Sequence, residues 1–158
     1  MKKTIITLLI LIFIITSCTR NKVFEEHHKL TNFTWKRVNS SIFFNVDIVD
    51  TDCNYDVYIA VRYIDGINLD NIETGLTIYT PDSAEYYDEY KIRIKSEDGS
   101  FRGSVAGDIW DISELVIKNM PFYKEGTYQF EIENLTGNLY ETRGIMEIGL
   151  ILKKSKIS

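Results

Sequence analysis

Two short stretches bring together the side chains of this sequence that are best suited to binding chemistry. In GDIWD, residues 107–111, Asp108 and Asp111 flank Trp110. Carboxylate oxygens can hold a calcium ion, and an indole beside them can stack on a sugar ring. The competing interpretation is structural, because Asp next to Gly is common in turns and a Trp at the start of a strand usually packs into the core. The sequence leaves both interpretations open.

A second candidate surface lies in EYYDEY, residues 85–90, where Tyr86, Tyr87 and Tyr90 stand among acidic residues. These tyrosines could form a binding surface. They could equally lean on the sheet of a charged hairpin, and we favour the hairpin.

Residues for catalysis are scarce. The two imidazoles, His27 and His28, are adjacent, so on an extended chain they point in opposite directions and make a poor metal pair. We place them in a solvated tether ahead of the folded domain. No serine or cysteine is paired with a base, and no glycine-rich phosphate loop is present. The sequence therefore predicts a binding or scaffolding protein without catalytic residues, metal or cofactor, rather than an enzyme.

The elements that must position these residues are strands. Apolar residues alternate with polar ones along most of the chain, which is typical of half-buried strands in antiparallel sheets. The inward-facing sets are Ile42, Phe44, Val46 and Ile48; Tyr55, Val57, Ile59, Val61 and Tyr63; Tyr90, Ile92 and Ile94; Tyr128, Phe130 and Ile132; and Met146, Ile148, Leu150 and Leu152. GLTIYT, residues 75–80, is a shorter example, whereas residues 107–118 are ambiguous and we interpret them as a loop or helical turn leading into a strand. Turn motifs between the runs predict an all-β fold, an antiparallel β-sandwich of jelly-roll type.

The N-terminus carries a candidate modification site. Two lysines precede an apolar run over residues 4–15, which is shorter than the about 20 residues that a membrane-spanning helix needs. The run ends in ITSC, which resembles a bacterial lipobox. We therefore expect residues 1–17 to be a cleaved lipoprotein signal peptide, Cys18 to be acylated, and residues 18–158 to form one lipid-anchored domain with a short N-terminal tether. An uncleaved N-terminal anchor is the alternative.

The charge of the chain excludes some partners. Cleavage would remove two of the 18 Lys and Arg residues and none of the 23 Asp and Glu residues, leaving a formal charge of −7. Such an acidic chain lacks the basic face that nucleic acid requires, and we expect contact with the membrane through the covalent lipid alone. With Cys18 acylated, Cys53 has no partner in the chain and is either a buried thiol or an intermolecular link.

Several of these stretches occur together, in order, in one family. VFEE, TWKR and YDVYIAVRYID are followed by DGSFRGSVAGDIWD, PFYKEGTYQFEIEN and GIMEIGL, and this order resembles the gliding motility lipoprotein GldH family of Bacteroidota. NLTGNLYETR departs from the segment expected at that place, which indicates a divergent branch.

The resemblance implies a small lipid-anchored β-sandwich without catalytic residues, associated with envelope proteins of the gliding apparatus and of the type IX secretion machinery. Thr19 after the cysteine, in place of Asp, favours the outer membrane, and we expect the periplasmic face rather than the cell surface. A lipid-anchored carbohydrate-binding module, with Trp110 and the three tyrosines stacking on sugar, is the alternative.

Overall fold

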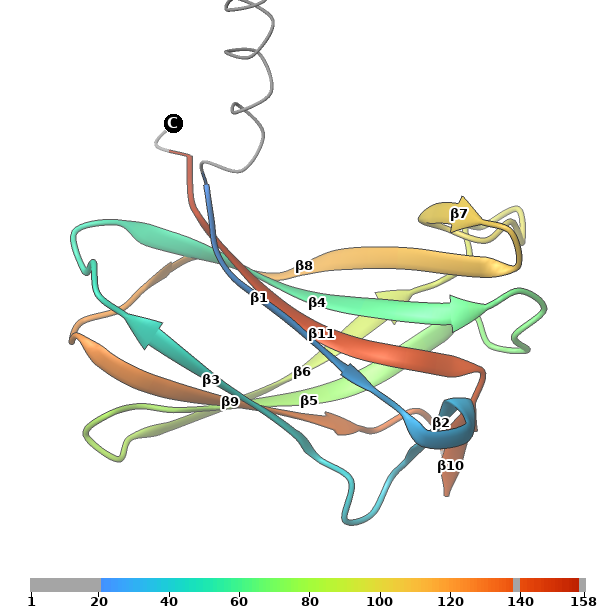
Figure 1. Cartoon of the computed structure of the whole chain (residues 1–158), viewed down its shortest axis with the longest axis horizontal. Coiled ribbons are helices and arrows are strands. Elements are labelled where there is room, and N and C mark those ends of the chain that lie inside the picture. Colours follow the sequence, from blue (N-terminus) through green and yellow to red (C-terminus); the bar gives the residue numbers. More distant parts are fainter. Residues whose placement is uncertain (1–20, 138–139, 157–158) are drawn as a thin grey trace, which may run out of the picture.

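A computed structural model describes residues 21–137 and 140–156, and these form a two-layered β-sandwich (Figure 1). The strands are β1 (Lys22–Lys29), β2 (Thr34–Lys36), β3 (Ile42–Ile48), β4 (Asn54–Ile64), β5 (Asn71–Tyr79), β6 (Glu85–Arg93), β7 (Ser104–Ala106), β8 (Ile109–Pro121), β9 (Gly126–Asn134), β10 (Glu141–Arg143) and β11 (Ile145–Lys154), with one 3-10 turn, η1 (Thr31–Phe33). Every strand pairing given for these residues is antiparallel. The predicted all-β antiparallel sandwich is confirmed.

Two main sheets make the layers. One has five strands in the order β1-β11-β4-β8-β7, and the other has four in the order β3-β9-β5-β6. A separate pair, β10-β2, lies at the end of the sandwich where β1 finishes (Figure 1). The first and last strands pair with each other, so the described chain starts and ends at the same place, with Lys22 opposite Lys153.

The core lies between the sheets and is filled by the alternating positions that the sequence indicated. Along β3 every second residue is buried, and in β9 the inward residues Tyr128, Phe130 and Ile132 are buried. A fully buried aromatic contributes one of the largest apolar areas in such a core, and Trp35, Tyr55 and Tyr63 join Phe130 there. These inward sets are therefore confirmed for β3, β4 and β9.

Residues 107–118 form a turn that leads into a strand, as expected, but the turn is confined to Gly107 and Asp108, because strand β8 starts already at Ile109 and runs on to Pro121. Its first residues pair with the end of β4, Trp110 opposite Tyr63 and Ile112 opposite Val61. Further along, the register shifts on either side of Val57. Such bulges place an extra residue in one strand and reverse its alternation, which is why β8 shows no clean period of two in the sequence.

Two smaller expectations also change. In β11 a register shift follows Ile145, so Ile145 is fully buried while Met146 is only partly buried. His27 and His28, which we placed in a tether, lie instead in strand β1, which pairs with β11 along its length. Its polar sequence fits an edge strand exposed to solvent, and that is why it shows no apolar alternation.

Within the residues that the structure describes, we find no helix long and apolar enough to cross a membrane. The predicted signal peptide and Cys18 lie outside the described residues.

Candidate binding surfaces

The GDIWD motif does not assemble a site. Trp110 packs beside the core against Phe101, with 5.6 Å between ring centroids, and its indole N–H donates to Asp65 Oδ1 at 3.0 Å. Asp108 is exposed in the turn before β8. Asp111 lies next to Trp110 in the strand and so points to the opposite face of the sheet. The three side chains therefore diverge, and the partly buried indole offers no open stacking platform.

Asp111 instead pairs with the side chain of Arg62, a contact that no sequence motif predicts. Arg62 of β4 donates through Nε to Asp111 Oδ1 at 2.7 Å and through Nη2 to Oδ2 at 3.2 Å, while its Nη1 is 3.2 Å from Glu147 Oε2 of β11. This fork geometry is the strong form of an Arg–carboxylate pair. The hydrogen bond that Arg62 donates to Asp111 is the main reason that the pKa of Arg62 is raised above its ordinary value.

The three tyrosines of EYYDEY are divided between two faces of β6. Tyr86 and Tyr90 pair with Ile78 and Thr74, which point inward, whereas Tyr87 pairs with Thr77 on the outer face. Tyr90 is partly buried, and loss of hydration raises its pKa to about 12, helped by Asp88. β5 and β6 form the expected charged hairpin, so these tyrosines do not form one binding surface.

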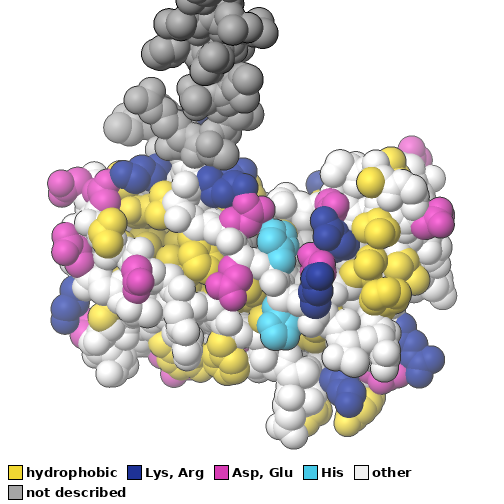
Figure 2. Space-filling model, viewed as in Figure 1, with side chains coloured by type: hydrophobic (Ala, Val, Ile, Leu, Met, Phe, Trp, Pro, Cys, Tyr) yellow, Lys and Arg dark blue, Asp and Glu magenta, His cyan; other side chains and the backbone are white. Residues whose placement is uncertain are grey.

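The histidines lie on opposite faces of β1, His27 opposite Gly149 and His28 opposite Ile148. Both are exposed, and both imidazoles are visible on the surface in Figure 2. No group of three or more His, Cys, Asp or Glu side chains suited to a metal ion occurs among the described residues. Cys53 is partly buried against the core, with its Sγ 3.5 Å from Asp50 Oδ2, which fits the interpretation as a packed thiol.

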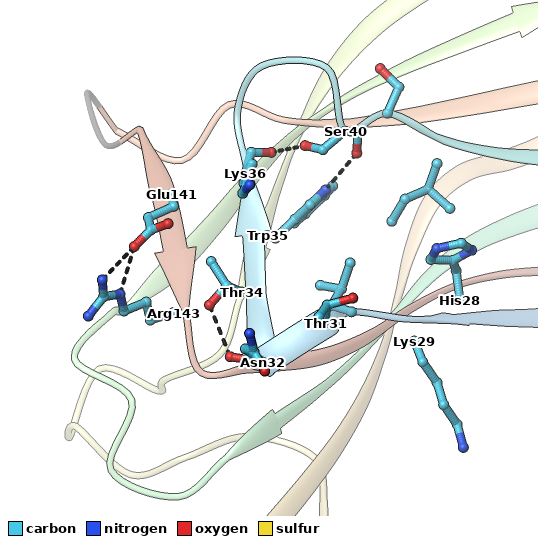
Figure 3. Close-up of a pocket in the computed structure, with 13 residues that line it drawn as sticks. His28, Lys29, Thr31, Asn32, Thr34, Trp35, Lys36, Ser40, Glu141 and Arg143 are labelled. Atoms are coloured by element: carbon cyan, nitrogen blue, oxygen red, sulfur yellow. Dashed lines mark hydrogen bonds and ion pairs between the residues drawn. The ribbon is translucent and has the colours of Figure 1, made fainter.

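A hollow of about 680 Å³ lies where β1, η1, β2 and β10 meet. Trp35 is fully buried beneath it, with its indole N–H donating to the Ser40 carbonyl at 3.3 Å. Figure 3 shows Glu141 and Arg143 on one side of β2 and His28 on the other. Arg143 Nη2 is 2.7 Å from Glu141 Oε1, so these charges bind each other. The hollow therefore lacks the converging acid, base or nucleophile that a catalytic site needs.

The outer face of the four-stranded sheet is the most distinctive surface. Its outward-facing alternate positions place aromatic side chains among carboxylates, and we call this set the acidic-aromatic face: Phe43 and Asp47 of β3; Glu131 and Glu133 of β9; Glu73 and Tyr79 of β5; and Glu85, Tyr87 and Glu89 of β6. Phe43 is 50% exposed and Tyr87 is 51% exposed. The face also carries Lys91 and Arg93, so carboxylates outnumber cations.

Three of the six carboxylates of this face, Asp47, Glu89 and Glu131, accept hydrogen bonds from neutral hydroxyls. Tyr79 donates its hydroxyl to Glu131 at 2.7 Å, and Thr127 donates to Asp47 at 2.6 Å. The bond to Glu131 is the main reason that the pKa of Tyr79 rises to about 12. Glu73 instead accepts a hydrogen bond from the charged Lys91, with Nζ 3.1 Å from Oε1. This bond lowers the pKa of the Glu73 carboxyl. The face therefore keeps its negative charge.

Sequence reasoning had placed Glu131 and Glu133 on an outer face but could not group them with Phe43 and Tyr79. The register brings them together: Phe43, Glu131, Thr77 and Tyr87 form one row across β3, β9, β5 and β6. These strands are far apart in the sequence, so only their pairing reveals the row.

A family model described as GldH lipoprotein matches residues 22–152. The chain belongs to the GldH lipoprotein family. It is 25% identical over 126 residues to the gliding motility lipoprotein GldH of Flavobacterium johnsoniae, which covers 80% of this chain and 77% of that relative. The family expected from the sequence motifs is thereby confirmed, and this GldH family member is a lipid-anchored protein of the cell envelope.

Among solved structures, the enzymatically active domain of tailspike protein 4 from bacteriophage CBA120 aligns with 85% of this chain and 18% of that chain, at 9% identity and a TM-score of 0.26. That likeness is too weak to support an argument about this GldH family member.

Proposed function

We propose that this protein is a non-catalytic lipoprotein of the gliding motility apparatus and of the type IX secretion machinery that shares components with it. It is held by lipid on Cys18 at the periplasmic face of the outer membrane, and it acts by binding another envelope protein. Membership of the GldH family and the gliding motility lipoprotein from Flavobacterium johnsoniae support this role.

The observation that carries the proposal is the acidic-aromatic face. Phe43 and Tyr87 are large, half-exposed and set beside carboxylates, a combination that suits a protein surface carrying Lys and Arg. Aromatic side chains anchor many protein interfaces, and both the charge and the ring faces attract cations. We therefore expect the partner to present a basic segment to this sheet.

The area of the acidic-aromatic face is smaller than that of a standard protein interface. Four strands about 4.8 Å apart and about eight residues long at about 3.3 Å per residue present about 500 Å². A standard interface buries about 800 Å² per partner, so the face by itself supports a weak complex. Confinement to a membrane raises the effective concentration of partners and makes a weak interface sufficient.

Photo-crosslinking in the native host tests the proposal. A photoreactive amino acid replaces Tyr87 in one strain and Leu115 in another; Leu115 is 40% exposed and pairs with Tyr58 on the other sheet, so it serves as the control. We expect mass spectrometry to identify motility or secretion components crosslinked to position 87 and not to position 115.

Charge reversal sharpens the same experiment. Glu131→Lys with Glu133→Lys on the acidic-aromatic face should lower the crosslinking yield at position 87 at least severalfold. Glu97→Lys with Glu125→Lys changes the total charge equally at exposed positions outside that face, and should leave the yield unchanged. Equal yields from both double variants would argue against the face, and specific glycan binding that Trp110→Ala abolishes would favour the carbohydrate-binding module instead.

A further inference from the structure

The end of the sandwich where the described chain begins carries lysines that the acidic total charge conceals. Lys22 of β1 lies opposite Lys153 of β11, and Lys153 lies opposite Asp56 of β4. Lys118 of β8 is close enough to Asp56 to help lower the pKa of that carboxyl, as is Lys153. Together with the exposed Lys156, these residues form what we call the lysine end: Lys22, Lys118, Lys153 and Lys156. Figure 2 shows Lys and Arg side chains at this edge of the domain, with Asp and Glu side chains beside them.

Two carboxylates at this end, Asp56 and Glu25, have hydrogen-bond or ion-pair partners. Asp56 accepts hydrogen bonds from the Asn119 amide at 3.0 Å and from the Ser155 hydroxyl at 2.6 Å. Glu25 pairs with Lys22 on the same strand. Lys153 is held with its Nζ 4.5 Å from the centre of the Tyr58 ring. Counting Lys154, which pairs with Asp50, five lysines at this end stand against four carboxylates, Glu25, Asp50, Asp52 and Asp56, so a small positive excess remains although the chain as a whole has a formal charge of −5.

Three of the four lysines of the lysine end lie in strands, and Lys156 follows two residues after the end of β11. The amide of Lys154 donates to the Asn21 carbonyl at 2.8 Å, and the amide of Ser155 donates to the Asn54 carbonyl at 2.8 Å. These bonds extend the pairing of β1, β11 and β4 to the last described residues. The positions of the lysines relative to the start of β1 are therefore set by the sheet.

The length of chain between the lipid and the sheet limits the distance to the membrane. The four residue steps from Cys18 to Lys22 span at most about 14 Å when fully extended. Electrostatic attraction to an anionic membrane surface decays over a Debye length of about 8 Å in physiological salt. A domain tethered this closely spends its time with its nearest end within reach of the headgroups, and that end carries lysines.

We propose that the lysine end docks on anionic phospholipid headgroups of the leaflet that holds the lipid anchor, and so fixes the orientation of the sandwich. This inference rests on the proposed anchoring through Cys18. Lys29, at the other end of β1, then stands about 23 Å further from the membrane, since seven residue steps rise about 3.3 Å each. Docking at one end of the sheets leaves the acidic-aromatic face free for a partner.

Lysine labelling of the lipidated full-length protein tests the inference. The protein is reconstituted into vesicles of phosphatidylcholine alone or mixed with phosphatidylglycerol, and reductive methylation at each lysine is followed by mass spectrometry. We expect Lys118, Lys153 and Lys156 to react severalfold more slowly on the anionic vesicles, and high salt to restore their reactivity. Lys91, on the acidic-aromatic face, should react equally on both.

A charge-reversed pair provides the second arm. Lys118→Glu with Lys153→Glu should abolish the protection of Lys156, whereas Lys36→Glu with Arg93→Glu, an equal change at exposed positions elsewhere, should preserve it. Protein that floats with both kinds of vesicle but shows equal labelling on them would overturn the docking and leave the anchor standing. Protein that does not float with vesicles at all would overturn the anchor through Cys18 and the docking together.

Discussion

The outer faces of the two sheets arrange their charges differently. On the five-stranded sheet, Lys29, Glu147, Arg62 and Asp111 lie opposite one another in a row across β1, β11, β4 and β8, so that charges alternate in sign. On the four-stranded sheet, Glu131 and Asp47 are held by the hydroxyls of Tyr79 and Thr127 instead of by cations.

The charges of the five-stranded face are compensated within the domain, whereas several carboxylates of the four-stranded face are not paired with a cation. A carboxylate paired with Arg has its charge compensated within the domain, whereas a hydroxyl donor satisfies a lone pair but leaves the charge in place. Opposite charges across neighbouring strands also stabilise the sheet slightly. The five-stranded face therefore contributes to stability, and the four-stranded face retains a potential that a basic partner can use.

The largest expected effect tests whether the two faces of β9 are assigned correctly. Phe130 points into the core and is fully buried, so Phe130→Ala should lower the free energy of unfolding by about 3 to 5 kcal/mol. Glu131 points outward, and Glu131→Ala should change it by no more than about 0.5 kcal/mol. Urea unfolding of both variants measures the difference, and equal losses would mean that the strand register is wrong.

A smaller effect should distinguish the two outer faces directly. Arg62→Met removes the paired guanidinium from the five-stranded sheet and leaves Asp111 and Glu147 without their cation. Because these side chains are partly exposed, we expect a loss of about 0.5 to 1.5 kcal/mol. Arg93→Met removes an exposed cation from the four-stranded sheet and should cost less than about 0.5 kcal/mol.

Thermal unfolding at low and high salt measures both arginine variants. High salt should shrink the effect of Arg62→Met, since screening weakens the pair in the wild-type protein. If the two substitutions cost the same at every salt concentration, the contrast between the faces would have no energetic basis.

The smallest expected effect concerns pH and the lysine end. Burial raises the pKa of Asp56, but the hydrogen bonds from Ser155 and Asn119 and the charges of Lys118 and Lys153 outweigh it, so the net pKa lies below the ordinary value of 3.8. A carboxyl whose pKa is lower in the folded than in the unfolded protein stabilises the fold above the unfolded pKa, and this contribution disappears as the pH falls through the folded pKa.

Asp56→Asn isolates that contribution, because the amide oxygen can still accept both hydrogen bonds without a charge. The wild-type protein should exceed the variant in stability at pH 7, and the advantage should vanish as the pH falls below about 4. Unfolding in urea across this range measures it. A difference between the two proteins that stays constant with pH would show that Asp56 is not linked to folding in this way.

The alternation of apolar and polar residues determined the fold class and most of the core. Each residue of a strand points to the face opposite its neighbours, so Phe44, Val46, Phe130 and Ile132 could be assigned inward from local order alone. The family motifs likewise were readable without coordinates. Prediction was wrong or incomplete where bulges break the alternation, at Met146 and along β8, and where an edge strand is polar on both faces, as in β1.

The candidate site could not be predicted in the same way. GDIWD and EYYDEY place attractive residue types next to each other in the sequence, but neighbours in a strand face opposite sides, so Trp110 separates from Asp111 and Tyr87 from Tyr86. The surfaces that do form draw single residues from several strands. Their membership depends on strand order and register, which short sequence motifs do not contain.

By itself, the sequence determined that this is an acidic, strand-rich chain of the GldH lipoprotein family with a candidate acylated cysteine at its start, because composition, period and ordered motifs are local properties. Only the tertiary structure decided that Arg62 neutralises Asp111, that Glu131 lies in one row with Phe43 and Tyr87, and that Lys22, Lys118 and Lys153 share one end. The physical reason is that electrostatic attraction and side-chain packing depend on distance in space, and antiparallel pairing between distant strands sets those distances.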